Sequence, residues 1–223
     1  NIIRSGVSVM LMFLGLSFYF SNGKLFTVPV NKNKIFLSIF FFISSVLFHS
    51  ASLLLLATFI LVKIVRLPNL YYLAILIGSL ILAIMGLGVS NLPIIGPYFL
   101  ANERLTSYLS GEAAQAPTGV TVFTLFFQFL ILLYCRLQSN SIRFDSTFQY
   151  LYKCYLVLSS FYILCLNISF SDRFGLYSWI FIPLLLVYPL TKQKGFNSFY
   201  NNIIFYCFIA IYFGLMVYRV GMN

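Results

Sequence analysis

His49 is the only histidine in the chain, and it stands inside the apolar run Ile35–Val62. Imidazole takes up and releases protons near neutral pH, so it suits a general base or a hydrogen-bond donor to a ligand. An ionisable side chain within a membrane segment is costly unless it faces a wet cavity or a partner, which makes it a functional candidate. Two roles stay open for His49: acid–base chemistry, with the hydroxyls of Ser50 and Ser52 beside it, or a structural hydrogen bond between helices.

The long polar connection Asn91–Gly119 carries Glu103, Arg104 and Tyr108 in an amphipathic stretch that follows Pro93, Gly96 and Pro97. A guanidinium grips phosphate with two parallel hydrogen bonds, and a carboxylate can accept or donate a proton. We predict Arg104 and Tyr108 as ligand contacts and Glu103 as a candidate acid–base residue. The connection can serve as a lid, as a helix lying on the bilayer, or as both.

Two other arginines stand at the ends of apolar segments. Asp172-Arg173 forms a tight turn with Tyr177 four residues after the arginine, so that Arg173 and Tyr177 share one helix face. Arg4 opens an apolar segment with Gly15 eleven residues later, on the same face. We predict Arg4, Arg173 and Tyr177 as ligand contacts and Asp172 as a second acid–base candidate. The alternatives are a self-neutralising surface pair at the turn and an Arg4 side chain that snorkels to lipid headgroups.

The elements that must position these residues are membrane-spanning helices. Of the 223 residues, 61% are hydrophobic and only 8% are charged, which indicates a polytopic all-α membrane protein. We expect a single integral-membrane domain over residues 1–223. Because the chain begins with Asn1 and shows no signal-peptide pattern, we also expect it to be a fragment of a longer chain. Six spans are clear: Ser5–Ser21, Tyr71–Ser90, Val120–Cys135, Leu151–Ile168, Phe174–Leu190 and Phe199–Val217.

The run Ile35–Val62 is too long for one pass of about 20 residues and short for two. With one pass, the lysines and arginines divide eight inside to six outside; with two passes that turn outward at His49, they divide ten to four. Cytoplasmic loops carry an excess of basic residues, so the second division is favoured. We therefore predict a bundle of about eight passes, two of them short or broken around His49, with His49 at the floor of an outward-facing cavity.

The two-pass topology also sorts the basic residues by type. All seven lysines fall inside, whereas the outer basic residues are four arginines: Arg4, Arg104, Arg173 and Arg219. Three acidic residues fall outside as well: Glu103, Glu112 and Asp172. Arginine suits planar recognition of phosphate better than lysine does. The outer face is therefore predicted to bind an anionic, oxygen-rich ligand, although four arginines is a number small enough for chance to produce.

Several function classes lack their sequence signals. The chain has no glycine-rich phosphate loop, no Asp-x-Asp motif and no His, Cys and carboxylate cluster with metal-ligand spacing. Its four cysteines form no CxxC pair, and we expect buried, inert thiols. The net charge of +10 is explained by the positive-inside rule, so no nucleic acid partner is expected. We predict no cofactor and, for an enzyme, a lipid-borne donor and metal-independent chemistry.

Four segments together resemble the O-antigen polymerase (Wzy) and EpsG-like family. They are Arg4 at the start of a span, LFHSASLLLL around His49, ERLTSYL after the proline-broken segment, and SDRFGLYSWIFIPLLL near the end. The resemblance covers most of the chain and matches the later, C-terminal part of that family's spans.

The resemblance implies a bacterial inner-membrane glycosyltransferase that polymerises oligosaccharide repeat units carried on undecaprenyl pyrophosphate, at the periplasmic face. Carried onto this sequence, Arg4, Arg104 and Arg173 become pyrophosphate or sugar contacts and His49 lies at the reaction centre. Glu103 or Asp172 would share the acid–base work. The partners implied are the lipid-linked oligosaccharide, membrane lipids and a chain-length regulator.

Two other functions stay open. An O-antigen ligase uses the same lipid donor, but it characteristically has a larger periplasmic loop than Asn91–Gly119. A flippase for the lipid-linked unit would move the same molecule without chemistry, but transporters tend to show internal repeats and polar groups along a through-path. The sequence shows no such repeat.

Overall fold

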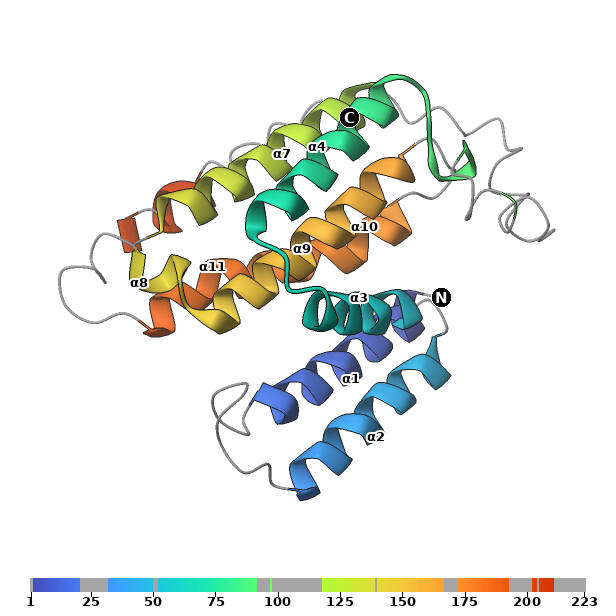
Figure 1. The fold of residues 1–223 in the computed structure, drawn as a ribbon, viewed down its shortest axis with the longest axis vertical. Helices are drawn as coiled ribbons and strands as arrows, with labels where there is room; N and C mark the ends of the chain where they lie inside the picture. Colours follow the sequence, from blue (N-terminus) through green and yellow to red (C-terminus); the bar gives the residue numbers. More distant parts are fainter. Residues whose placement is uncertain are drawn as a thin grey trace. The chain divides into compact units, whose positions relative to one another are not determined.

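The chain folds into helices that form two compact units, Asn1–Arg66 and Leu67–Asn223 (Figure 1). The computed structural model describes residues 2–20, 32–49, 52–91, 97, 118–138, 140–166, 172–192, 202–203 and 205–210. These residues are helical or lie in turns between helices, and none of them is in a strand. The predicted all-α class is confirmed for this part of the chain. The prediction of a single integral-membrane domain stays a prediction.

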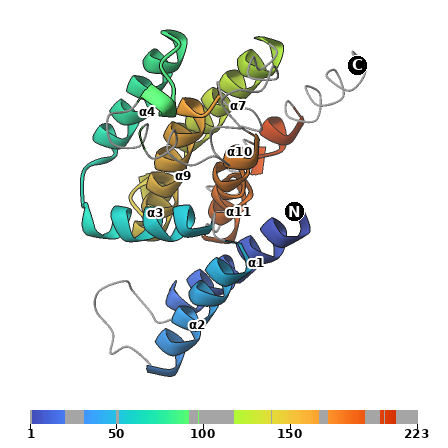
Figure 2. The ribbon, with the colours of Figure 1, turned by 90° about the vertical axis from the view of Figure 1, so that its right-hand side faces the viewer.

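The described residues of the first unit form three helices: α1 (Ile2–Phe20), α2 (Lys32–Phe48) and α3 (Leu53–Ile64). Helices α1 and α2 lie side by side in both views (Figure 1, Figure 2). The helix break predicted at His49 is confirmed, because α2 ends at Phe48 and α3 begins at Leu53. The run Ile35–Val62 is therefore a helical hairpin and not one long helix.

Side-chain contacts fix the directions of these helices. Ser8 contacts Ser45, and Gly15 contacts Ser38, so α1 and α2 are antiparallel. Ser8 also contacts Ser52, and the hydroxyl of Tyr19 accepts a hydrogen bond from Lys63. Both pairs are offset by the same 44 residues, so α3 runs parallel to α1. The turn at His49 therefore lies at the end of the unit where α1 begins.

Small residues let α1 and α2 approach closely. Ser38 Oγ donates to the carbonyl oxygen of Gly15 over 2.8 Å. A Cβ atom on Gly15 would lie 2.6 Å from the ring of Phe42, so only glycine fits there without movement of that ring. Helices in lipid associate through such small-residue contacts, because apolar side chains gain little by leaving one hydrocarbon environment for another.

The second unit is organised around α9 (Ser146–Leu164), which packs against α4 (Asn69–Ile84), α10 (Asp172–Trp179) and α11 (Phe181–Lys192). Figure 2 shows α9 between α4 and the α10–α11 pair. The remaining elements are η2 (Val89–Asn91), α7 (Thr118–Leu137) and the short α8 (Asn140–Arg143). Eleven residues of α9 are buried, so this helix forms the core of the unit.

Asp145 marks the beginning of α9. Its side chain accepts hydrogen bonds from the backbone N–H groups of Thr147 and Phe148, which would otherwise lack partners at a helix start. The hydroxyl of Tyr188, near the end of α11, also donates to Asp145 over 2.7 Å. At the other end of α9 the rings of Tyr162 and Trp179 meet edge to face. Helices α9 and α10–α11 are therefore antiparallel.

Helix α4 stops earlier than the predicted span Tyr71–Ser90. Gly86 adopts a φ of +76°, and the N–H groups of Gly86 and Leu87 donate to the carbonyls of Ala83 and Leu82. This pair of bonds is a Schellman ending, which favours glycine in the left-handed region. The span prediction is thus wrong over its last six residues, because hydropathy does not register the stop at Gly86.

One helical segment among the described residues, Phe174–Lys192, is long and apolar enough to cross a membrane. Four other apolar stretches are shorter: Gly6–Tyr19, Leu53–Ile64, Asn69–Ile84 and Phe126–Leu137. The 12-residue α3 rises only about 18 Å, against about 30 Å of hydrocarbon in a bilayer. The predicted eight passes are therefore not confirmed, and the number of passes stays a prediction.

Candidate functional site

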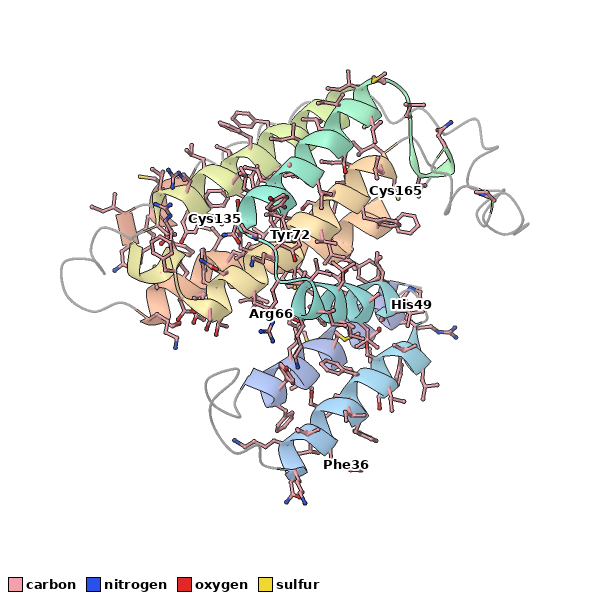
Figure 3. The ribbon with its side chains drawn as sticks, viewed as in Figure 1. Phe36, His49, Arg66, Tyr72, Cys135 and Cys165 are labelled. Atoms are coloured by element: carbon pink, nitrogen blue, oxygen red, sulfur yellow. The ribbon has the colours of Figure 1, made fainter. Side chains whose placement is uncertain are left out.

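The His49 turn is held by backbone hydrogen bonds on both sides. The N–H of His49 donates to the carbonyl of Ser45 over 3.1 Å, and the N–H of Ser52 donates to the carbonyl of His49 over 2.9 Å. The histidine is half-buried. Figure 3 shows it at the end of the first unit opposite to Arg66. The backbone that carries the imidazole is therefore fixed, although it belongs to neither helix.

Three buried hydroxyls lie directly beneath this turn: Ser8, Ser45 and Ser52, which we name the serine cluster. Ser8 Oγ donates to the Ser45 carbonyl over 2.9 Å, and Ser45 Oγ donates to the Ser8 carbonyl over 2.7 Å. The hydroxyls of Ser8 and Ser52 are also hydrogen-bonded. Ser8 belongs to α1, Ser45 to α2, and Ser52 is the residue directly before α3, so the cluster ties the three helices together at the end where His49 lies.

Arg4 belongs to the same end of the unit. It stands four residues before Ser8 on α1, so the two residues lie on one helix face, with Arg4 one turn nearer the helix start. Arg4 is exposed, whereas Ser8 is buried against the other two helices. The face shared by Arg4 and Gly15 is the one that meets α2, since Gly15 contacts Ser38. The structure thus brings a guanidinium and an imidazole to one end of a three-helix scaffold.

Lysines occupy the opposite end of this unit. Lys63, in the last turn of α3, donates to the hydroxyl of Tyr19 and lies 4.5 Å from the centroid of its ring. Lys32 and Lys34 open α2, which begins at that end because it is antiparallel to α1. The three lysines and the pair of Arg4 and His49 are therefore separated by the length of the helices. The predicted two-pass topology requires this separation, because it puts the lysines inside and Arg4 and His49 outside.

The second unit also carries charged residues at two opposite ends. The last turns of α7, α8 and α11 carry Arg136, Arg143 and Lys192. These ends lie near the start of α9, because Tyr134 of α7 donates to the Leu186 carbonyl of α11 and Tyr188 of α11 donates to Asp145, the N-cap of α9. Cys135 and Cys165 mark the two opposite ends of this unit in Figure 3. Asp172 and Arg173 open α10, at the end where α9 finishes.

The other predicted site residues are only partly described. Arg173 and Tyr177 both belong to α10, which confirms that they share a helix, and Tyr177 is only 3% exposed. The side chains of Asp172 and Arg173 lie outside the described residues, as do Glu103, Arg104 and Tyr108. The roles predicted for these residues stay predictions.

The comparison with known families decides the affiliation of the chain. The EpsG family model matches residues 1–221. The chain belongs to the EpsG family. This membership indicates a membrane protein of polysaccharide biosynthesis with a glycosyltransferase-like polymerase role. Neither a curated protein nor a solved structure gives a significant match.

In this EpsG-family chain, sequence reasoning missed Ser8 and Ser45. A signal for them was present, since Ser8 and Gly15 are seven residues apart on α1 and Ser38 and Ser45 are seven apart on α2. Seven residues are two helical turns, so each pair of small residues marks one face. Matching the two faces in antiparallel order gives the observed contacts of Ser8 with Ser45 and of Gly15 with Ser38.

Proposed function

We propose that the chain polymerises lipid-linked oligosaccharide repeat units, carried on undecaprenyl pyrophosphate, into O-antigen or a related surface polysaccharide. The reaction would take place at the periplasmic face of the bacterial inner membrane and would need no metal ion. Membership in the EpsG family supports the general class of function. The donor lipid, the membrane face and the residue roles are our inference.

The observation that carries the proposal is the placement of Arg4 and His49 at one end of the first unit. The serine cluster fixes this end, and the lysines lie at the other. Lysine-rich ends face the cytoplasm by the positive-inside rule, which assigns Arg4 and His49 to the outer face. A polymerase of this type needs there a cation for the pyrophosphate and a base for the acceptor hydroxyl.

The chemistry follows from these two groups. An imidazole nitrogen of His49 takes the proton from a hydroxyl of the acceptor sugar, and that oxygen attacks the anomeric carbon of the donor chain. The bond between this carbon and the pyrophosphate oxygen breaks, and its electron pair leaves with undecaprenyl pyrophosphate. Arg4 stabilises the charge that develops on the departing oxygen. The proton on His49 is then released to water.

The remaining predicted residues, except Tyr177, fit this scheme as further contacts. Arg104 and Arg173 would hold the second pyrophosphate or the sugars, and Glu103 or Asp172 would share the proton transfer. Tyr108 would contact sugar from the long connection. Tyr177 is buried, so it would act by holding the helix that carries Arg173. A chain-length regulator would be a protein partner of this assembly.

The surface glycan tests this function. A strain lacking the chain is expected to display single repeat units and no polymer, because export continues and only chain growth stops. Gel electrophoresis of the surface polysaccharide would show this as one band in place of a ladder. A strain with neither single units nor polymer would point to a flippase. Polymer that accumulates on the lipid carrier without transfer to its final acceptor would point to a ligase. Either result contradicts the proposal.

Labelling from outside the cell tests the sidedness of the site. In intact spheroplasts, a membrane-impermeant maleimide should modify His49→Cys and Ser171→Cys but not Lys32→Cys. The background needs only Cys207→Ser, because the other native cysteines are buried and Cys207 is exposed. Permeabilised cells should label all three positions. Labelling of positions 49 and 171 from opposite sides of the membrane would contradict the proposed assignment of both positions to the outer face.

A further inference from the structure

A cavity of about 190 Å³ lies in the second unit, where α7 ends and α9 begins. Two arginines line it, Arg136 and Arg143, together with the amide-bearing residues Asn69 and Gln149 and the aromatic residues Phe148 and Tyr152. Arg136 is in the last turn of α7, and Arg143 ends α8. The cavity thus combines two positive charges with polar donors and an aromatic wall, and none of its residues belongs to the site proposed above.

The two arginines are not neutralised within the part of the chain that the structure describes. Neither guanidinium forms an ion pair with a described carboxylate, and Arg143 lies 5.9 Å from the centroid of the Phe144 ring. Nearby Lys153, by contrast, donates a hydrogen bond to the Leu67 carbonyl over 2.8 Å. Two arginines that line one cavity without an ion-pair partner among the described residues indicate an anionic ligand with several oxygens.

The wall of the cavity is firmly held. Gln149 donates through its side-chain amide to the Arg143 carbonyl over 3.0 Å, which fixes the end of α8 against α9. Asp145 caps α9 between them. These two contacts hold the cavity wall in place without a ligand.

The surroundings point to a lipid. Phe144 is 71% exposed and Leu137 is 45% exposed, and both stand beside the arginines where the apolar helix α7 ends. Apolar side chains next to cations at a helix end suit the level of the headgroups, where anionic lipids attract basic residues. We propose that this arginine pocket binds the phosphate of an anionic phospholipid such as phosphatidylglycerol. The proposal does not depend on polysaccharide synthesis.

Lipid titration of the purified full chain in detergent, followed by native mass spectrometry, tests the pocket. Phosphatidylglycerol is expected to bind at least tenfold more tightly than phosphatidylcholine. Its affinity should fall about fivefold in Arg136→Gln and about thirtyfold in Arg136→Gln/Arg143→Gln, since each basic residue near anionic lipid contributes about that factor. Because Arg136 is exposed, the single variant is expected to fold. It therefore tests the pocket even if the double variant does not fold.

The matched control is Lys192→Gln, which removes a charge at the same end of the unit but outside the cavity. Its phosphatidylglycerol affinity should stay within about twofold of the unaltered chain. The proposal would be contradicted if Lys192→Gln and Arg136→Gln lost the same amount of phosphatidylglycerol affinity. It would also be contradicted if the arginine variants lost none. Glycerol 3-phosphate, which has the phosphate without acyl chains, should not compete at equal concentration. Competition at that concentration would make the ligand a soluble phosphate ester and overturn the lipid assignment.

Discussion

His49→Ala is expected to reduce polymer formation by about a hundredfold or more, while single repeat units still reach the cell surface. A general base contributes a factor of this size, because without it the acceptor hydroxyl must lose its proton to water. The variant protein should be present in the membrane at a normal level. The measurement is the length distribution of the surface polysaccharide, together with the amount of the chain in the membrane fraction.

Two further variants separate the catalytic role of His49 from a structural one. His49→Gln keeps a side chain that can hydrogen-bond between helices but cannot act as a base, so it should fail like the alanine variant. Leu47→Ala alters a neighbour that is 80% exposed and should leave the polymer unchanged. Polymer of normal length in His49→Gln would remove His49 from the reaction and leave it a structural residue.

The second large effect is expected from Gly15→Leu, which inserts a side chain where α1 meets α2. Its Cβ alone would lie 2.6 Å from Phe42 Cε1 and 3.1 Å from the Ser38 carbonyl oxygen, so the helices must move apart. Phe42 also contacts Phe59 of α3, so the disturbance would reach the third helix. Overpacking of this kind lowers the free energy of unfolding by about 1–3 kcal/mol. Separation of α1 from α2 would also break the serine cluster and abolish polymerisation.

Gly6→Leu is the matched control on the same helix. No atom lies within 4 Å of a Cβ atom built at Gly6, so its side chain would have free space. We expect the free energy of unfolding to change by no more than about 0.5 kcal/mol. Both variants can be compared by thermal unfolding in detergent. Equal unfolding temperatures would show that α1 and α2 do not meet at Gly15.

The sequence predicted the helical class and the break at His49 for sound physical reasons. The run Ile35–Val62 is too long for one pass, and the distribution of basic residues favoured a turn near its middle. The structure places that turn between Phe48 and Leu53. Both arguments use only the hydropathy and the charge of the residues along the chain. These properties are known without knowledge of how the helices pack.

Helix boundaries were less accurate, because apolar length and helix length are different properties. Helix α9 starts at Ser146, five residues before the predicted span, since the Asp145 cap begins it in a polar segment. Helix α4 ends at Ile84 because of the chain reversal at Gly86. In both cases hydrogen bonds of the backbone at the helix end decide the boundary. The hydropathy of the segment does not.

The site was predicted only in part. Arg4 and His49 were both expected at the outer membrane face. The structure places them at one end of the first unit, and the membrane face stays a prediction. The serine cluster that fixes this end was missed, because serine in a membrane helix usually returns its hydrogen bond to its own backbone, as Thr58 does toward Leu54. Only the pairing of helix faces distinguishes a hydroxyl that bridges two helices from one that does not.

The shortness of α3 bears on the lipid around the protein. If its lysine end is anchored at one surface, a helix that rises about 18 Å leaves roughly 12 Å of an average bilayer uncrossed. Hydrophobic mismatch of this size is relieved by local thinning of the membrane or by water that penetrates from the unfilled side. In the proposed topology, either response would bring the water boundary closer to His49, so a polar sugar could reach the imidazole without entering hydrocarbon.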